Sequence, residues 1–400
     1  MSIDTAAIPA SYTSLSGNRK TLTVLQLLAH FDASGPARLA LEFSSALVAT
    51  GGQAHIAFDG ATISTHELVR NGVKFTPIKL AKRNPLSALN TARRVARFAT
   101  ENGVDIIHAQ NASLAVIGHA AAKKAGCRLV TTFHDGPNSL SALSKRSLAA
   151  FAGSDHVVTP SRTTAAEIAR ILPDLGSRIS VVPYGIDFSR FDAAQVTAPR
   201  VIQLAQQWRV PEDLPVIMLP ARFERDKGQS IVVEALSLIR THDLRCILVG
   251  PDGPDGAYRE KLTGEIARHD LSDRILLAEE VRDMPAALML ADVVLAPYLA
   301  PAMYNRVILE AQALGRPVVA SDFPCAHELL EDSSMAWIIP PGDAEALSIA
   351  ISEALALGSD ERNVRAAQVI ANLRSRADRL AMNETMLGIY LHLAGKTATA

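Results

Sequence analysis

The stretch PVIMLPARFERDKGQSIVVEALSLI, residues 215–239, joins a short apolar run to a segment with helical spacing. Three basic and two acidic residues are concentrated at the junction, between Arg222 and Lys227. A buried strand that leads directly into a helix is typical of a βαβ unit, and open α/β sheets bind ligands beyond the carboxyl ends of their strands. The stretch therefore predicts a parallel sheet with a binding site at residues 220–229.

Apolar runs alternate with segments of helical spacing along most of the chain, in two series. The first series lies at residues 21–28, 53–58, 104–110, 128–134, 155–161 and 179–185, and the second at residues 215–221, 244–250, 274–279, 291–297, 316–321 and 336–340. Residues 85–103 illustrate the helices, with Pro85 near the start and Gly103 just after the end. The alternation predicts parallel sheets, and the polar stretch between the two series, residues 192–213, predicts a linker.

The length of the chain indicates two domains. With 400 residues, 48% of them hydrophobic, it exceeds what one core usually organises. We expect an α/β protein of two doubly wound, Rossmann-like domains facing a central cleft, formed by residues 1–195 and 196–380. A long final helix is predicted at about residues 361–393, where apolar residues recur at intervals of three and four, and residues 381–400 are expected to pack back on the first domain.

Composition and charge exclude several classes of protein. The formal net charge of -1 provides no general attraction to nucleic acid or to a membrane. Cys127, Cys246 and Cys325 are far apart and lack metal-ligand spacing, so we expect free thiols in a reducing cytoplasm rather than a disulfide framework or a zinc site. The sequence does not open with a basic start and an apolar core, and no segment reaches about 18 uninterrupted apolar residues, so a soluble or peripheral protein is expected.

A set of motifs recurs in a specific order. The second half carries PARFERDKGQ (220–229), CILVGPDG (246–253), VRDMPAALMLADVVLAPY (281–298), VILEAQALGRPVVASD (307–322) and WIIPPGDAEALSIAI (337–351), and the first half carries TTFHD (131–135) and VPYGIDFSRFD (182–192). In this order and spacing, over nearly the whole chain, the sequence resembles the family 4 retaining glycosyltransferases of the GT-B fold. The resemblance is strongest in the second half, and it identifies 182–192 with the family's interdomain segment.

The resemblance implies three contacts to a nucleotide-sugar donor. Arg222 and Lys227 are implied to hold its diphosphate, and a guanidinium fork beside an ammonium group suits two adjacent phosphates. Glu310 is implied to accept hydrogen bonds from the ribose hydroxyls. Taken alone, the two cations would be read as part of a solvated loop paired with Glu224 and Asp226, and Glu310 as a residue favoured by the dipole of a helix start.

Four further positions are implied to lie near the donor. His134, at the end of a strand, corresponds to the family's cleft histidine beside the donor sugar, although a histidine at a strand end is often structural. Gly35, in a first strand-to-helix turn that the family usually builds with two glycines, is expected to allow phosphates to approach backbone N–H groups. Gly250 and Val281 lie in the segments through which the family contacts the base, largely by backbone.

The chain departs from the family pattern at positions where the family contacts the donor sugar. The family carries two glutamates eight positions apart, but Ala302 occupies the first position, and Tyr304 and Asn305 follow where phenylalanine and glycine are usual. Pro324 and Cys325 replace a customary pair of glycines, and proline has no N–H to donate. A missing charged hydrogen bond to a hexose hydroxyl costs roughly 1.5–3 kcal/mol, which permits either an altered donor sugar or a weakened enzyme.

A basic stretch forms another candidate surface. Residues 68–100 contain eight Lys or Arg and no Asp or Glu: Arg70, Lys74, Lys79, Lys82, Arg83, Arg93, Arg94 and Arg97. On a helical projection Arg93, Arg94 and Arg97 cluster, while Leu89, Ala92 and Ala96 lie on another face. The cluster suits anionic lipid headgroups or a phosphorylated, lipid-linked acceptor, and the alternative is an ordinary solvated helix. Nucleic acid is disfavoured because no aromatic residues are interleaved for stacking.

Two functions are compatible with these residues. The first is a retaining hexosyltransferase that moves a sugar from a UDP- or GDP-linked donor to a cell-envelope glycan or lipid-linked acceptor, of the lipopolysaccharide or exopolysaccharide type. It would act in the cytoplasm or as a peripheral protein on the inner face of the cytoplasmic membrane, with no cofactor besides the donor substrate and no metal. The second is a catalytically impaired relative that binds nucleotide as a partner or regulatory subunit.

Overall fold

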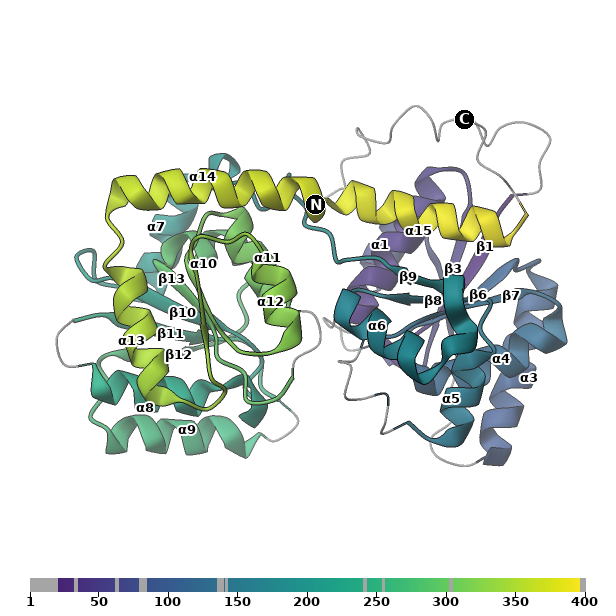
Figure 1. Cartoon of the computed structure of the whole chain (residues 1–400), viewed down its shortest axis with the longest axis horizontal. Coiled ribbons are helices and arrows are strands. Elements are labelled where there is room, and N and C mark those ends of the chain that lie inside the picture. The colour runs from purple at the N-terminus through teal and green to yellow at the C-terminus, as the bar shows by residue number, and fades with distance from the viewer. Residues whose placement is uncertain are drawn as a thin grey trace. The chain divides into compact units, whose positions relative to one another are not determined.

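The computed structural model describes residues 21–31, 35–61, 65–78, 85–134, 140, 143–239, 243–253, 256–301 and 305–395. The chain divides into two compact units (Figure 1). The first unit comprises Met1–Tyr184 together with Leu380–Ala400, and the second comprises Gly185–Arg379. The chain therefore passes from one unit to the other twice, after Tyr184 and after Arg379.

The first unit is built on a seven-stranded parallel sheet of order β5-β3-β1-β6-β7-β8-β9. Its strands are β1 (Thr23–Leu27), β3 (Gln53–Phe58), β5 (Lys74–Pro77), β6 (Ile106–Ala109), β7 (Arg128–Thr132), β8 (His156–Thr159) and β9 (Ile179–Val181). Its helices are α1 (Gly35–Ala49), α2 (His66–Arg70), α3 (Pro85–Glu101), α4 (Ala112–Ala125), α5 (Lys145–Ala152) and α6 (Arg162–Ile171), and α15 (Arg379–Leu393) returns to it. The short strands β2 (His30–Phe31) and β4 (Gly60–Ala61) pair with each other.

The second unit is built on a six-stranded parallel sheet of order β12-β11-β10-β13-β14-β15. Its strands are β10 (Val216–Pro220), β11 (Arg245–Val249), β12 (Ile275–Ala278), β13 (Val293–Ala296), β14 (Val318–Ser321) and β15 (Ala336–Ile339). Its helices are α7 (Ala198–Gln207), α8 (Gln229–Leu238), α9 (Ala257–Arg268), α10 (Met284–Leu290), α11 (Arg306–Ala313), α12 (Pro324–Leu330), α13 (Ala344–Leu355) and α14 (Ser359–Arg376). In both sheets the strand order reverses next to the first strand, which is the doubly wound arrangement predicted from the sequence.

The apolar runs form strands because both faces of each sheet are covered. On β10, Ile217 and Leu219 pack into a core with α8, α9 and α13, while Met218, between them, packs into a core with α10 and α11. Successive side chains of a strand point to opposite faces, so a run that is apolar throughout requires helices on both sides. Figure 1 shows α8 and α9 on one side of this sheet and α10 and α11 on the other.

The stretch expected to be a linker is part of the second unit instead. Residues 192–213 contain a 3-10 helix (η4, Ala193–Gln195) and α7, and Val196, Leu204 and Trp208 are buried in the core that also contains α10 and α11. The polar composition was misleading because α7 is amphipathic and buries only one face. The division between the units falls after Tyr184, about ten residues before the boundary expected at residue 195.

The long final helix predicted at residues 361–393 is two helices, α14 and α15, separated at Ala377 and Asp378. Here Asp378 pairs with Ile186 in an isolated parallel bridge, and the N–H of Ile186 donates to the carbonyl of Ala377 at 2.7 Å. A Cβ on Gly185 would overlap the backbone of Arg379, so only glycine allows the two segments to lie this close.

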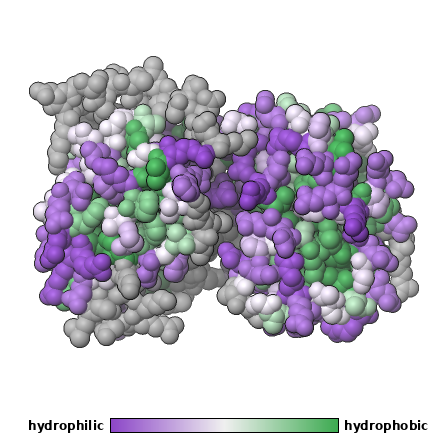
Figure 2. Space-filling model, turned by 180° about the vertical axis from the view of Figure 1, so that it is seen from behind, coloured by the Kyte–Doolittle hydropathy of each residue, from purple (hydrophilic) through white to green (hydrophobic). Residues whose placement is uncertain are grey.

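The surface is mostly hydrophilic in the view of Figure 2, with apolar residues gathered in a few areas. Among the described helices, none is long and apolar enough to cross a membrane.

Candidate functional site

The carboxyl ends of the strands in the second unit bring the predicted donor contacts to one edge of its sheet. Because the strands are parallel, the loops that follow them meet at the same edge. Arg222 and Lys227 lie in the loop between β10 and α8, and Gly250 directly follows β11. Glu310 lies on α11, which follows β13. Strand order therefore gathers residues that are up to 88 positions apart in sequence.

Two glycines allow the loops at this edge to pack tightly. Gly228 has φ +79°, and a Cβ there would overlap the carbonyl of Pro297, just after β13. A Cβ on Gly250 would overlap the carbonyl of Ala221, just after β10. The N–H of Leu299 also donates to the carbonyl of Asp226 at 2.8 Å. The loops after β10, β11 and β13 are thus held against one another by backbone contacts that leave no room for side chains.

The two predicted phosphate ligands are exposed enough to meet a ligand, and each has an acidic partner. The Arg222 guanidinium lies 3.5 Å from the Glu224 carboxylate, and the Lys227 ammonium donates to Asp226 at 2.7 Å. Lys227 also lies 4.9 Å from the ring centroid of Tyr298, a cation–π distance. The ion pairs that the sequence allowed as an alternative are present, so an incoming diphosphate would compete with carboxylates for both cations.

Glu310 is buried on α11, at 8% exposure, one turn beyond the helix start. Asn305 caps this helix, because its side chain accepts a hydrogen bond from the N–H of Val307. The guanidinium of Arg306 lies 3.7 Å from the Glu310 carboxylate, an ion pair that the sequence analysis did not anticipate. The signal that could have found it is the spacing of four between opposite charges on a helix.

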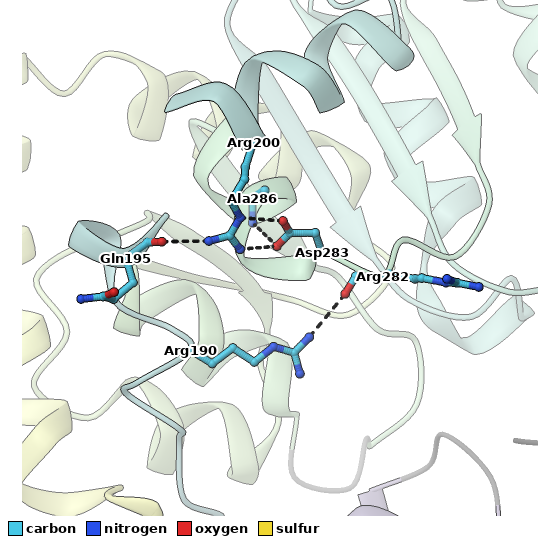
Figure 3. A network of polar contacts seen from close by, with 6 residues as sticks. All are labelled: Arg190, Gln195, Arg200, Arg282, Asp283 and Ala286. Carbon is cyan, nitrogen blue, oxygen red and sulfur yellow. Dashed lines mark hydrogen bonds and ion pairs between the residues drawn. The ribbon is translucent and has the colours of Figure 1, made fainter. Parts of the chain in front are cut away.

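The segment that contains Val281 is held by two arginines, Arg190 and Arg200, of which Arg200 belongs to the stretch expected to be a linker. Val281 itself is partly buried against the core of the second unit. Arg200 of α7 donates to both carboxylate oxygens of Asp283, at 2.7 and 2.8 Å, and these hydrogen bonds lower the pKa of Asp283. Arg190 donates to the carbonyl of Arg282 (Figure 3). Sequence reasoning missed these contacts because they join residues more than 80 positions apart.

The residues that differ from the family pattern are only partly described. Ala302 and Tyr304 lie outside the described residues, as does Ser34 beside Gly35. Pro324 is the first residue of α12. The helix loses no hydrogen bond through the missing N–H, because the first N–H groups of a helix have no partner within it, but this position has no backbone donor to offer a ligand. Burial raises the pKa of the Cys325 thiol to about 11, so this side chain is neutral at physiological pH.

In the first unit His134 and Gly35 are brought together by Tyr184. An ideal Cβ on Gly35, the first residue of α1, would lie 3.8 Å from the Tyr184 ring, and the Tyr184 hydroxyl lies 2.7 Å from Nδ1 of His134. His134 lies two residues after the end of β7 and is only 4% exposed. Burial lowers the pKa of His134 to about 3, so the imidazole is neutral at physiological pH.

Sequence reasoning also missed a buried polar cluster next to His134. Its members Gln26, His108, Gln110 and Thr132 lie on or just after β1, β6 and β7, and Tyr390 joins them from α15. The signal was a polar side chain inside an apolar run, such as Gln26 within TLTVLQLL. Buried polar side chains of this kind need hydrogen-bond partners, which these residues supply to one another.

Three arginines of the basic stretch lie on one exposed face of α3. Arg93, Arg94 and Arg97 are exposed, while Ala92 and Ala96 are buried. Leu89, which the helical projection places on another face than the arginines, is 43% exposed. Among the described side chains of this stretch, Val69 and Phe75 are also large, apolar and exposed. Lys79, Lys82 and Arg83 lie outside the described residues.

Within the described ranges, no group of three or more His, Cys, Asp and Glu side chains is placed to hold a metal ion.

Two family models match the chain. The model described as "Glycosyl transferases group 1" matches residues 214–356, and the model described as "Glycosyltransferase Family 4" matches residues 33–190. Together they span about three quarters of the sequence, one in each unit.

Curated relatives carry related descriptions. The chain is 27% identical over 268 residues to a phosphatidyl-myo-inositol mannosyltransferase of Mycolicibacterium smegmatis, a match that covers 65% of this chain and 64% of that protein. It is 29% identical over 250 residues to a D-inositol 3-phosphate glycosyltransferase of Xylanimonas cellulosilytica, covering 60% of this chain and 57% of that one. The aligned regions thus span less than two thirds of both relatives.

Solved structures share the fold over nearly the whole chain. A glycosyltransferase from Rickettsia africae superposes with a TM-score of 0.83 at 23% identity, covering 94% of this chain and 99% of that one. HepE of Anabaena, in complex with UDP and glucose, superposes with a TM-score of 0.80 at 21% identity, covering 92% and 99%. At these identities the likeness establishes the two-domain α/β architecture of the GT-B type.

Proposed function

Because the chain belongs to the family 4 glycosyltransferases of the GT-B fold, we propose that it is a retaining hexosyltransferase. Its donor is a nucleotide-diphosphate sugar, UDP- or GDP-linked, and its acceptor is a cell-envelope glycan or a lipid-linked glycan. Both chemical partners are proposed from the site and from the descriptions of its relatives.

The observation that carries this proposal is the pair of cations on one tightly packed loop at the ligand-binding edge of the second unit. Arg222 offers a planar fork and Lys227 a compact charge, a combination suited to two adjacent phosphates. Their loop is fixed against its neighbours through Gly228 and Gly250. Cations held in place before the reaction stabilise the charge that grows on a leaving diphosphate without reorganising.

The remaining donor contacts follow from the same edge. Glu310, buried and paired with Arg306, presents a carboxylate that can accept hydrogen bonds from two vicinal ribose hydroxyls. Gly250 and the segment at Val281 offer backbone groups to the base, and the Arg200–Asp283 pair keeps that segment in place.

In the proposed reaction the acceptor oxygen attacks the face of the sugar from which the diphosphate leaves. The leaving phosphate oxygen takes the proton of the acceptor, so no side-chain base is required. The state of His134 is consistent with this route, since a buried imidazole with a pKa of about 3 does not accept a proton at neutral pH. We assign His134 to positioning the reacting groups.

The acceptor side is proposed to lie at an anionic membrane surface. Exposed Arg93, Arg94 and Arg97 on α3 provide positive charge at that surface. Two relatives are named for inositol-containing acceptors, which supports a polar, phosphorylated acceptor for this chain as well.

The test is a screen of purified full-length protein against nucleotides and nucleotide sugars, with thermal shift and donor hydrolysis measured side by side. A donor that both stabilises the protein and is consumed supports the transferase. Arg222→Ala should weaken both signals, whereas Arg225→Ala should retain them, because Arg225 lies on the same loop but stacks over the ring of Tyr258 at 5.8 Å. Stabilisation by UDP or GDP without consumption of any donor, with acceptors added, would favour the nucleotide-binding partner instead.

A further inference from the structure

Seven buried side chains of the first unit form one continuous chain of hydrogen bonds. It begins at Tyr184, passes through His134, Gln110, Gln26, Tyr390 and His108, and ends at Thr132. The successive distances are 2.7, 2.8, 2.7, 3.1, 2.6 and 2.6 Å. All seven residues are at most 4% exposed, so their polar groups depend on one another and not on bulk water.

The bonds of this chain all point in one direction. The amide oxygen of Gln110 can only accept, so Nε2 of His134 carries the proton and donates to it. Nδ1 of His134 is then an acceptor, and the Tyr184 hydroxyl donates to it. Further along, the Gln110 amide donates to Gln26, and Gln26 donates to the Tyr390 hydroxyl.

The Tyr390 oxygen accepts a hydrogen bond from Gln26. Because a buried hydroxyl proton needs an acceptor, we orient it towards Nδ1 of His108, which leaves Nε2 of His108 to donate to Thr132. Turning the Gln110 amide over would break its bonds to both His134 and Gln26. The tautomer of His134 is therefore tied to both amides rather than to one neighbour.

Both tyrosines of this hydrogen-bond chain belong to segments that adjoin the second unit in the sequence. Tyr184 is the last residue before the sequence passes into the second unit, and its ring packs beside Gly35 at the start of α1. Tyr390 comes from α15, on the segment that returns from the second unit. The two ring nitrogens of His134 are thus bonded to Tyr184 and Gln110, two residues that no local sequence pattern connects with it.

We propose that Gln110 and Tyr184 are positioning residues for His134, with Gln110 fixing the imidazole proton on Nε2 and Tyr184 fixing the ring beside the start of α1. This role rests on the glycosyltransferase function proposed above. Neither residue touches the reacting atoms; both act through His134, which must present one orientation and one tautomer for transfer to proceed at full rate. A purely structural network would affect stability alone.

The test combines histidine NMR with kinetics on the full-length protein. In ¹⁵N-histidine-labelled protein, with the His134 signals assigned from a His134→Asn variant, we expect a neutral ring with the proton on Nε2. Gln110→Met removes the acceptor while keeping the length of the side chain, so the Nε2 tautomer should no longer be fixed. Tyr184→Phe removes one oxygen atom, so the Nδ1 signal should move while Nε2 keeps its proton.

Both variants should lower kcat about 3- to 10-fold, the rate equivalent of one neutral hydrogen bond, and should leave KM for the donor within about twofold. Thr131→Val is the matched control. Thr131 precedes Thr132 on β7, is equally buried and bonds instead to Ser154 at 2.9 Å, so its loss should change neither kcat nor the His134 signals. Tyr184→Phe keeps the shape of the core and remains testable if Gln110→Met does not fold.

The outcomes separate this role from the proposed function. A His134 proton on Nδ1 in the unmodified protein would overturn it, as would a lower kcat with unmoved His134 signals or moved signals with unchanged kcat. Those results leave the transferase standing. If the unmodified protein consumes no nucleotide sugar, the proposed function fails and the positioning role fails with it.

Discussion

The ammonium group of Lys227 lies over the ring of Tyr298, 4.9 Å from its centroid, while it donates a hydrogen bond to Asp226. The two residues come from loops that follow neighbouring strands, β10 and β13. Burial raises the pKa of the Tyr298 phenol, so the ring stays neutral and its face remains attractive to a cation. The position of Lys227 is therefore set before any ligand arrives.

Removing either cation should weaken nucleotide binding. We expect Arg222→Ala and Lys227→Ala each to raise the Kd for UDP or GDP about 10- to 100-fold, the equivalent of one charge-assisted hydrogen bond. Isothermal titration calorimetry measures this directly, and Arg225→Ala controls for the change in loop charge. Unchanged affinity in both variants would remove these residues from the site.

Gly228 should not tolerate a side chain. Its φ of +79° is costly for other residues, and an added Cβ would overlap the carbonyl of Pro297, so Gly228→Ala should lower the free energy of unfolding by about 2 kcal/mol or more. Urea unfolding of the second unit can be followed by fluorescence, because Trp208 and Trp337 both lie there.

Gly264→Ala is the control for Gly228. Gly264 lies within α9, with nothing within 4 Å of an added Cβ, so alanine should raise stability by about 0.5–1 kcal/mol. Equal effects of the two substitutions would contradict the close approach of the loops after β10 and β13.

Acid should destabilise the first unit through its buried histidines. Burial lowers the pKa of His108 and of His134 to about 3, below the unfolded value of 6.5. Both are neutral in the folded state, so their stabilising effect is complete above pH 6.5 and is lost as the pH falls from there towards 3. Between pH 7 and pH 5 the loss should be about 2 kcal/mol for each histidine.

Urea unfolding followed by circular dichroism at pH 7 and pH 5 measures this loss. His134→Gln should reduce the difference in the free energy of unfolding between pH 7 and pH 5 by about 2 kcal/mol, the contribution of one histidine. The control His327→Gln changes an exposed histidine of the second unit and should leave the difference as it was. If His134→Gln leaves the pH dependence of the free energy of unfolding unchanged, His134 is protonated or accessible in the folded state.

The exposed face of α3 should bind anionic membranes. Reversing the charge of Arg93, Arg94 and Arg97 together should weaken the free energy of binding to anionic liposomes by about 1 kcal/mol per residue, as measured by co-sedimentation. The effect should vanish at high salt. Reversal of three other exposed basic residues in the same unit, Lys123, Lys124 and Arg146, controls for net charge. Equal sedimentation of both variants would return α3 to an ordinary solvated helix.

Much of the architecture could be predicted because it depends on local periodicity. The run VIMLP of β10 is apolar at every position, which in a parallel sheet means burial on both faces, and the glycine and charges that follow mark the turn into α8. The order of the motifs similarly placed Arg222, Lys227 and Glu310 on the loops and helix where the structure has them.

The errors arose where a local pattern has two readings. Residues 192–213 look like a linker because α7 buries only one face, and residues 361–393 look like one helix because the break at Ala377 carries neither proline nor glycine. Gly185 marked the nearby close approach in the sequence, but its partner Arg379 lies almost 200 positions away.

The sequence by itself determined the two doubly wound units, their strands and the cationic loop, since these follow from the alternation of apolar runs, turns and charges over a few residues. Only the tertiary structure decided that His134 is buried and neutral and that Tyr184 and Gln110 bond to its two nitrogens. It also decided that Arg200 pairs with Asp283 and Arg306 with Glu310. The physical reason is that a buried polar group takes whichever partner the strand order brings within reach, and strand order joins residues that are distant in the chain.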